Sequence, residues 1–211
     1  MRTPILCLIL SSTLLAQGRF TPMFNGRNFD GWVVDTAHVW WAREGMIVGK
    51  SPGLEYNEFL RTPKQYSDFI LKVSVRLVGG KGNSGIQFRS KAVPDSHAVS
   101  GYQADVGENY WGSLYDEERR KKVIAQASPK SLATLKPDGW NEYVITARGN
   151  RITLDLNGVR TVDYTEKDSS IPATGIIALQ VHSGAAMEVH QVLGHGVLEA
   201  VLPSDCKGRL L

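Results

Sequence analysis

The chain has 211 residues, of which 42% are hydrophobic, and its 24 Lys and Arg exceed its 21 Asp and Glu by three. This length and composition suit one globular domain with a sizeable core. So balanced a charge gives no reason to expect a nucleic-acid partner or attraction to an anionic membrane surface. The oligomeric state is left open by the sequence.

Residues 1–17 have the pattern of a secretory signal peptide. Arg2 gives a short basic start, an apolar stretch follows, and Ala16 supplies a small residue where a peptidase could cut. The apolar stretch is too short for a comfortable membrane span, and no other segment approaches that length. We therefore expect a secreted or periplasmic protein without membrane insertion. Once residues 1–17 are removed, the chain keeps one cysteine, Cys206, so it cannot form an internal disulfide.

From residue 18 to residue 196, short alternating runs typical of β-strands follow one another. The 21 glycines, with Asn, Asp and Pro, separate these runs. The pattern is clearest in "ITARGNRITLDLNGVRTV", where Gly149-Asn150 and Asn157-Gly158 are two-residue turns of an antiparallel meander. The predicted strands are 39–48, 56–61, 68–78, 84–90, 101–106, 140–148, 151–156, 159–164, 175–181 and 186–193.

About ten strands without crossover helices predict an all-β fold, an antiparallel two-sheet jelly-roll sandwich. Residues 107–139 are less regular, and long irregular insertions in a compact β domain are commonly functional loops. Residues 197–211 are predicted to form a C-terminal tail outside the domain. Trp32, Trp40 and Trp140 are expected in the core.

Three of the predicted strands each place two polar side chains opposite their apolar residues. The pairs are Gln87 with Arg89, Gln103 with Asp105, and Gln180 with His182. One such strand would be ordinary on a solvated face, but three favour a shared site. All six side chains can form hydrogen bonds or carry a proton. If the strands are neighbours, these side chains form the floor of a groove that suits the hydroxyl groups of a sugar.

Six segments resemble, in order, the 3-keto-disaccharide hydrolase family. They are "FNGRNFDGW" (24–32), "GNSGIQFRS" (82–90), "GYQAD" (101–105), "LYDEERR" (114–120), "GWNEYVITARGNRITLDLNGV" (139–159) and "GIIALQVHSG" (175–184). The resemblance covers roughly residues 20–193. It implies a concanavalin A-like jelly roll and a carbohydrate substrate, a glycoside whose sugar is oxidised at C3.

The implied chemistry gives roles to three of the groove residues. A 3-keto group acidifies the neighbouring C–H bonds, so a base can remove a proton and expel the glycosidic oxygen, after which water adds to the product. His182 is the natural base because of its titration range. Arg89 would stabilise the enolate. Asp105 would orient His182 or help to hold a divalent cation.

Other residues are expected to bind the substrate. They are Gln87, Gln103, Gln180, Trp111, Tyr115 and Glu117. Trp111 and Tyr115 would stack on a sugar ring, although loop aromatics also plug the ends of sandwiches. A second mechanism remains open, in which two carboxylates flank the glycosidic bond. Asp105 would then pair with an acid from the irregular region, namely Glu108, Asp116, Glu117 or Glu118.

A non-catalytic carbohydrate-binding module is the main alternative to an enzyme, because the same face of a jelly roll serves lectins. A structural or adhesion domain is a further alternative. The sequence contains no HExxH and no GxSxG, so neither that zinc site nor a serine nucleophile is expected.

Overall fold

The structure is a computed structural model that describes residues 20–51, 53–182, 191–193 and 199–201. The predicted signal peptide, residues 1–17, lies outside the described residues, as do Cys206 and most of the predicted tail. No helix in the described ranges is long and apolar enough to cross a membrane.

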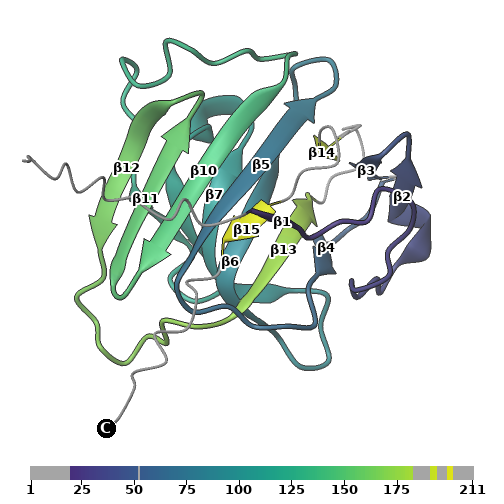
Figure 1. Ribbon diagram of the computed structural model, residues 1–211, viewed down its shortest axis with the longest axis horizontal. Helices are drawn as coiled ribbons and strands as arrows, with labels where there is room; N and C mark the ends of the chain where they lie inside the picture. Colours follow the sequence, from purple (N-terminus) through teal and green to yellow (C-terminus); the bar gives the residue numbers. More distant parts are fainter. Residues whose placement is uncertain (1–19, 52, 183–190, 194–198, 202–211) are drawn as a thin grey trace, which may run out of the picture.

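Two antiparallel sheets form the layers of a sandwich (Figure 1). The larger sheet contains β1 (Thr21–Pro22), β2 (Trp40–Arg43), β3 (Met46–Gly49), β5 (Phe69–Leu77), β10 (Asn141–Arg148), β11 (Arg151–Leu156), β12 (Val159–Thr165), β14 (Gln191–Leu193) and β15 (Glu199–Val201). The smaller sheet runs in the order β4 (Glu58–Arg61), β13 (Ile176–Val181), β6 (Ser84–Ala92), β7 (Val99–Val106), β8 (Leu114–Glu117) and β9 (Lys122–Ala125). Two short 3-10 helices, η1 (Ala37–Val39) and η2 (Glu108–Tyr110), complete the described elements. The predicted all-β jelly-roll sandwich is confirmed.

Three predicted segments differ from the structure. The single strand expected at 39–48 is a hairpin of β2 and β3, because Glu44 and Gly45 turn the chain with φ values of 53° and 76°. The irregular region 107–139 contains the β8–β9 hairpin, which extends the smaller sheet. The predicted tail contributes β15, which pairs with β5 and β1.

The core lies between the two sheets and is formed by side chains at every second position of the strands. In β5, the side chains of Phe69, Leu71, Val73, Val75 and Leu77 are buried at every second position. Each such burial contributes about 1.5–3 kcal/mol, so the sandwich needs no disulfide to account for its packing.

The three tryptophans that were expected in the core differ in outcome. Trp32 and Trp40 are buried there, as predicted. Trp140 is 36% exposed, because it stands in the turn before β10 rather than within the strand. Its predicted core position is therefore wrong.

The three strands that carry the polar pairs are neighbours. β6 lies between β13 and β7 in the smaller sheet, as predicted. Gln87 stands opposite Gln103, while Gly85 stands opposite Asp105 on one side and Gln180 on the other. Because the alternate residues of these strands are packed in the core, the groups at these positions face outward.

Candidate functional site

A groove of about 270 Å³ lies on the outer face of the smaller sheet. Its lining residues are Asn57, Asn83, Gln103, Asp105, Tyr110, Tyr115, Glu117, Gln180 and His182. Six of these were named from the sequence. The lining is mainly amides, carboxyls and phenols, which together offer both donors and acceptors to a hydroxylated ligand.

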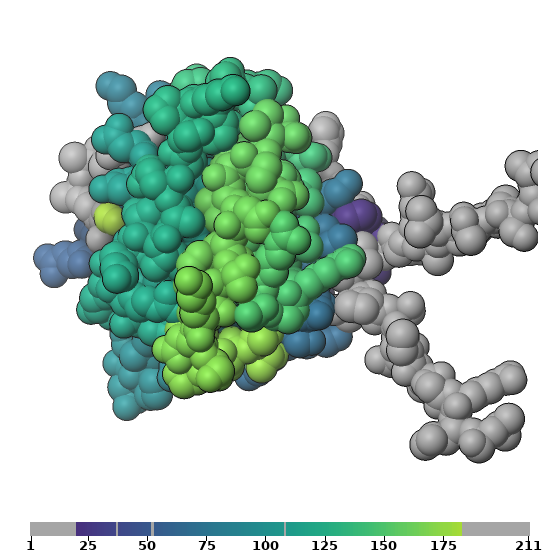
Figure 2. All heavy atoms as spheres, turned by 90° about the vertical axis from the view of Figure 1, so that its left-hand side faces the viewer, coloured from purple at the N-terminus to yellow at the C-terminus, as the bar shows by residue number. Residues whose placement is uncertain are grey.

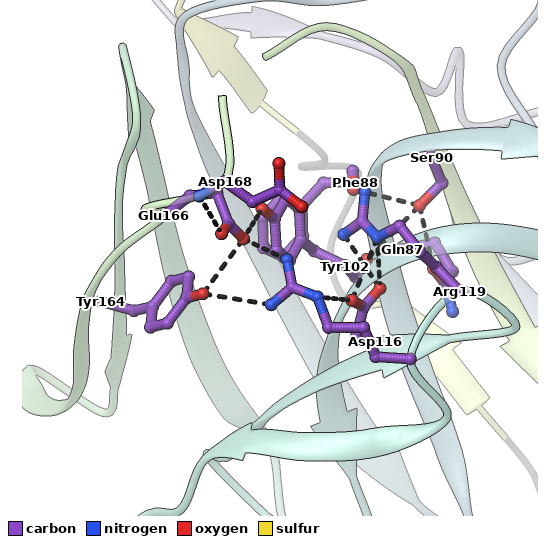
Figure 3. Close-up of polar contacts among 10 residues, drawn as sticks. Gln87, Phe88, Ser90, Tyr102, Asp116, Arg119, Tyr164, Glu166 and Asp168 are labelled. Carbon is purple, nitrogen blue, oxygen red and sulfur yellow. Dashed lines mark hydrogen bonds and ion pairs between the residues drawn. The ribbon is translucent and has the colours of Figure 1, made fainter. Parts of the chain in front are cut away.

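A chain of hydrogen bonds holds Asp105 in place. The Ser90 hydroxyl donates to Gln87 Oε1 at 3.0 Å (Figure 3). Gln87 Nε2 donates to Gln103 Oε1 at 2.6 Å. Gln103 Nε2 then donates to Asp105 Oδ1 at 2.6 Å. Gln87 is fully buried and does not line the groove. It therefore supports Gln103 and is not a direct substrate contact.

Burial raises the pKa of Asp105 to about 7, and the nearby charge of Glu117 adds to this shift. The hydrogen bond from Gln103 opposes it. Because the side chain is 4% exposed, little water reaches the carboxylate to stabilise its charge. A carboxyl with this pKa exchanges its proton close to neutral pH, which is the range required of a general base.

Glu117 is the second carboxyl of the groove. Burial and the neighbouring Glu118 raise its pKa to about 7, while a hydrogen bond from Asn57 and the charge of Lys121 oppose the shift. Two carboxyls that both titrate near neutrality in one groove can divide the roles of base and acid.

The structure does not bring Arg89 to the groove, and this part of the prediction is wrong. A β-bulge shifts the register between Phe88 and Lys91, and Arg89 itself has a φ of 47°. The bulge breaks the alternation on which the prediction depended. The guanidinium instead donates to the Ser67 carbonyl, the Gly149 carbonyl and the Asp68 carboxylate.

Trp111 is also placed differently from the prediction. Its side chain is 2% exposed and stacks on Tyr143 in the core, with ring centroids 6.4 Å apart. It is therefore not available to a sugar. The neighbouring Tyr110 is 43% exposed and lines the groove with Tyr115.

Three groove residues were missed by sequence reasoning: Asn57, Asn83 and Tyr110. All three lie outside the strands, in the segments before β4 and β6 and in η2. Alternation gives no signal for such positions. Within the described ranges, no group of three or more His, Cys, Asp or Glu side chains is arranged to hold a metal ion. The divalent cation near Asp105 stays a prediction.

A second polar cluster supports β7 and β8 from behind, on the face opposite the groove (Figure 3). Glu166 accepts hydrogen bonds from the hydroxyls of Tyr102 at 2.6 Å and Tyr164 at 3.0 Å, and it forms an ion pair with Arg120. Arg120 also contacts Asp116 of β8 at 2.9 Å. In Figure 2, the green segment that contains β12 lies beside teal segments that precede it in the chain.

Several solved structures share this fold. A candidate glycosyl hydrolase from Parabacteroides distasonis ATCC 8503 is 19% identical, with a TM-score of 0.65 over 90% of this chain and 95% of that one. The carbohydrate-binding module CBM66 from Bacillus subtilis is 21% identical, with a TM-score of 0.58 over 79% and 93%. The exoplasmic/lumenal domain of VIP36, in its Ca²⁺/Man-bound form, is 10% identical, with a TM-score of 0.56 over 84% and 85%.

A search of curated protein sequences gave no match. The family model described as the 3-keto-α-glucoside-1,2-lyase-like domain matches residues 19–192, which is most of the chain. The chain therefore belongs to the 3-keto-α-glucoside-1,2-lyase-like domain family.

Proposed function

We propose that this protein cleaves 3-keto-glycosides by elimination across C1 and C2 of the oxidised sugar. The observation that carries the proposal is the presence of Asp105 and Glu117 in one groove, each with a pKa raised to about 7. The family description, a 1,2-lyase-like domain, names the same pair of carbons.

Asp105 is the proposed base. It removes the proton on C2, and the electrons of that C–H bond form an enolate whose charge rests on the C3 oxygen. The chain of amides behind Asp105 fixes the carboxylate in one orientation, which favours proton transfer in a defined direction. The sequence predicted His182 as the base, because histidine side chains ordinarily titrate near neutral pH. The proposed mechanism gives the role of base to Asp105 instead.

Glu117 is the proposed acid. As the enolate collapses, the C1=C2 bond forms, the bond from C1 to the glycosidic oxygen breaks, and that oxygen takes the proton of Glu117. The products are an unsaturated 3-keto sugar and the free alcohol, with all atoms of the substrate accounted for. Addition of water across C1=C2 then gives the 3-keto sugar, so the sum of both steps is hydrolysis.

The remaining groove residues suit recognition of the ring and its charge. Gln180 lies on β13 and His182 directly follows that strand. Both can donate to the developing enolate oxygen, whereas the Arg89 guanidinium lies too far from the groove to do so. Asn83 can bind hydroxyls, and Tyr110 and Tyr115 offer aromatic rings beside them. We also propose that residues 1–17 direct export, which would place this groove where extracellular or periplasmic glycosides occur.

The test is to incubate the purified protein with 3-keto-trehalose and with trehalose, with and without a chelator, and to follow products by NMR. We expect cleavage of the 3-keto substrate alone. Asp105→Asn and Glu117→Gln should each lower turnover roughly 100-fold or more. Glu142→Gln is the matched control, because Glu142 is exposed on β10 of the other sheet.

Three further results would bear on the conclusion. Binding of either sugar without product would favour the carbohydrate-binding module. Loss of activity with the chelator, restored by a divalent cation, would support the predicted metal. If His182→Ala abolished turnover while Asp105→Asn kept most of it, the base would be His182.

A further inference from the structure

The groove continues into a second cavity of about 460 Å³. This cavity is lined by Tyr56, Asn57, Asp95, Ser96, His97, Ala98, Glu117 and Glu118. It shares two residues with the first cavity, Asn57 and Glu117. These two side chains are hydrogen-bonded to each other, so the bonded pair stands at the boundary between the two cavities.

We propose that the second cavity is the subsite for the leaving-group sugar of a 3-keto-disaccharide, which would bind with one ring on each side of Glu117. This inference rests on the proposed function. It adds where each ring lies and which residues select the leaving group.

The positions of the two carboxyls set the direction of the substrate. Asp105 lines the first cavity and is not among the residues of the second, so the ring that loses its C2 proton belongs in the first cavity. The glycosidic oxygen lies between the two rings of a disaccharide. Its proton donor must therefore stand at the junction of the two cavities, and Glu117 is the carboxyl with a pKa of about 7 at that place.

The second cavity has the chemistry of a sugar subsite. The Tyr56 ring stacks on the His97 ring, with centroids 4.0 Å apart and planes inclined by 18°. His97 is held from behind, because its Nδ1 lies 3.0 Å from Oε2 of the fully buried Glu58. Such an anchored ring pair gives a rigid platform, and Asp95 and Ser96 place polar groups beside it.

The test compares two substrates that share the oxidised ring: 3-keto-trehalose and methyl 3-keto-α-glucoside. The quantity measured for the purified protein is the kcat/KM for 3-keto-trehalose divided by the kcat/KM for methyl 3-keto-α-glucoside. Removing the platform with Tyr56→Ala should lower this ratio about fivefold to tenfold, the scale of one aromatic contact. Because Tyr56 is 36% exposed, the substitution should leave the Tm close to that of the wild type.

Tyr110→Ala is the matched control, because Tyr110 is a similarly exposed tyrosine that lines only the first cavity. It should lower kcat/KM for both substrates and leave their ratio within about twofold. A ratio unaffected by Tyr56→Ala, while the wild type cleaves both substrates, would overturn the second subsite and leave the proposed function standing.

If the wild type cleaved neither substrate, the proposed function would fail, and calorimetric titration would still decide the subsite. The subsite predicts that Tyr56→Ala weakens the Kd of the disaccharide about fivefold to tenfold and changes that of the methyl glycoside less than twofold. Equal changes in both Kd values, or no binding of the disaccharide, would overturn it.

Discussion

Gly85 leaves the space that the side chain of Gln103 occupies. A Cβ atom at position 85 would lie 2.2 Å from Cδ and 2.4 Å from Oε1 of Gln103, far inside contact distance. Gln103 is buried and links Gln87 to Asp105, so a displacement of its carboxamide would break that link. The orientation of the proposed base therefore depends on a residue that has no side chain.

Gly85→Ala should lower turnover at least tenfold. The added methyl group displaces the Gln103 carboxamide, and Asp105 then loses the hydrogen bond that fixes it. Steady-state kinetics with 3-keto-trehalose would measure the loss, and circular dichroism would show that the sandwich is retained.

The double-variant cycle is the control for this mechanism. Gln103→Ala alone should cause a similar loss, and Gly85→Ala should cost little more in that background, because both changes break the same link. Fully additive losses would show that Gly85 acts by another route.

The pH dependence of kcat/KM should be a bell with its optimum close to pH 7. Asp105 must be deprotonated to act as base, so activity should rise as pH increases through its pKa of about 7. Glu117 must be protonated to act as acid, so activity should fall as pH increases through its own pKa of about 7. A rate that is flat from pH 5 to pH 9 would contradict both assignments.

The two limbs of the bell can be assigned with variants. The residual activity of Asp105→Asn should lose the acid limb, and that of Glu117→Gln should lose the alkaline limb. The control Glu142→Gln should keep both limbs. The reverse pattern would exchange the roles of the two carboxyls.

Alternation predicted the architecture and part of the site from the sequence, because a side-chain period of two fixes which residues leave the core. Gln103, Asp105, Gln180 and His182 were predicted to share a groove, and they line one. The same rule failed for Arg89, because a bulge adds a residue to the strand and reverses the facing beyond it. Nothing in the short run "FRSKA" marks that bulge.

The loop residues show a second limit of the sequence. Asn57 precedes β4, yet it meets Glu117 of β8, and the order of strands in a sheet follows from tertiary contacts that single-sequence patterns do not carry. Trp111 and Tyr110 are adjacent aromatics in an irregular segment, one buried and one exposed. Without a period, the sequence could not tell which of them faces the groove.

Asp105→Asn should stabilise the protein at alkaline pH while it removes activity. The pKa of Asp105 is about 7 in the folded protein and 3.8 in the reference state. Between these values the folded state binds more protons than the unfolded state, so the free energy of unfolding of the wild type falls as pH rises. At pH 8 the variant should be more stable by about 2–4 kcal/mol.

Urea unfolding at pH 4 and at pH 8 would measure this difference. The advantage of Asp105→Asn should be small at pH 4, where the wild-type carboxyl is already neutral in the fold. Glu142→Gln should show no comparable change between the two pH values. If the variant were only as stable as the wild type at pH 8, or less stable, the ionised Asp105 carboxylate would not destabilise the folded protein, and the prediction would be wrong.

Glu166→Gln should have the opposite dependence on pH. Burial alone would raise the pKa of Glu166, but hydrogen bonds from Tyr102 and Arg120 outweigh it and lower the pKa to about 2, from 4.5 in the reference state. The stability that this charge provides is complete above pH 4.5 and is lost as pH falls toward 2. At pH 7 the variant should therefore lose about 1–3 kcal/mol, because a hydrogen-bonded charge is removed from a nearly buried network.

The measurement is urea unfolding of wild type and Glu166→Gln at pH 7 and at pH 3. The difference between the two proteins should shrink at pH 3, where the carboxyl of the unfolded wild type, with its pKa of 4.5, has already gained its proton. The exposed Asp163 of β12 supplies a matched control, since Asp163→Asn removes an ion pair with Arg151 that lies in solvent and contributes little to stability. Equal destabilisation by Glu166→Gln at both pH values would show that packing around Glu166, and not its charge, joins β12 to the strands that carry the groove.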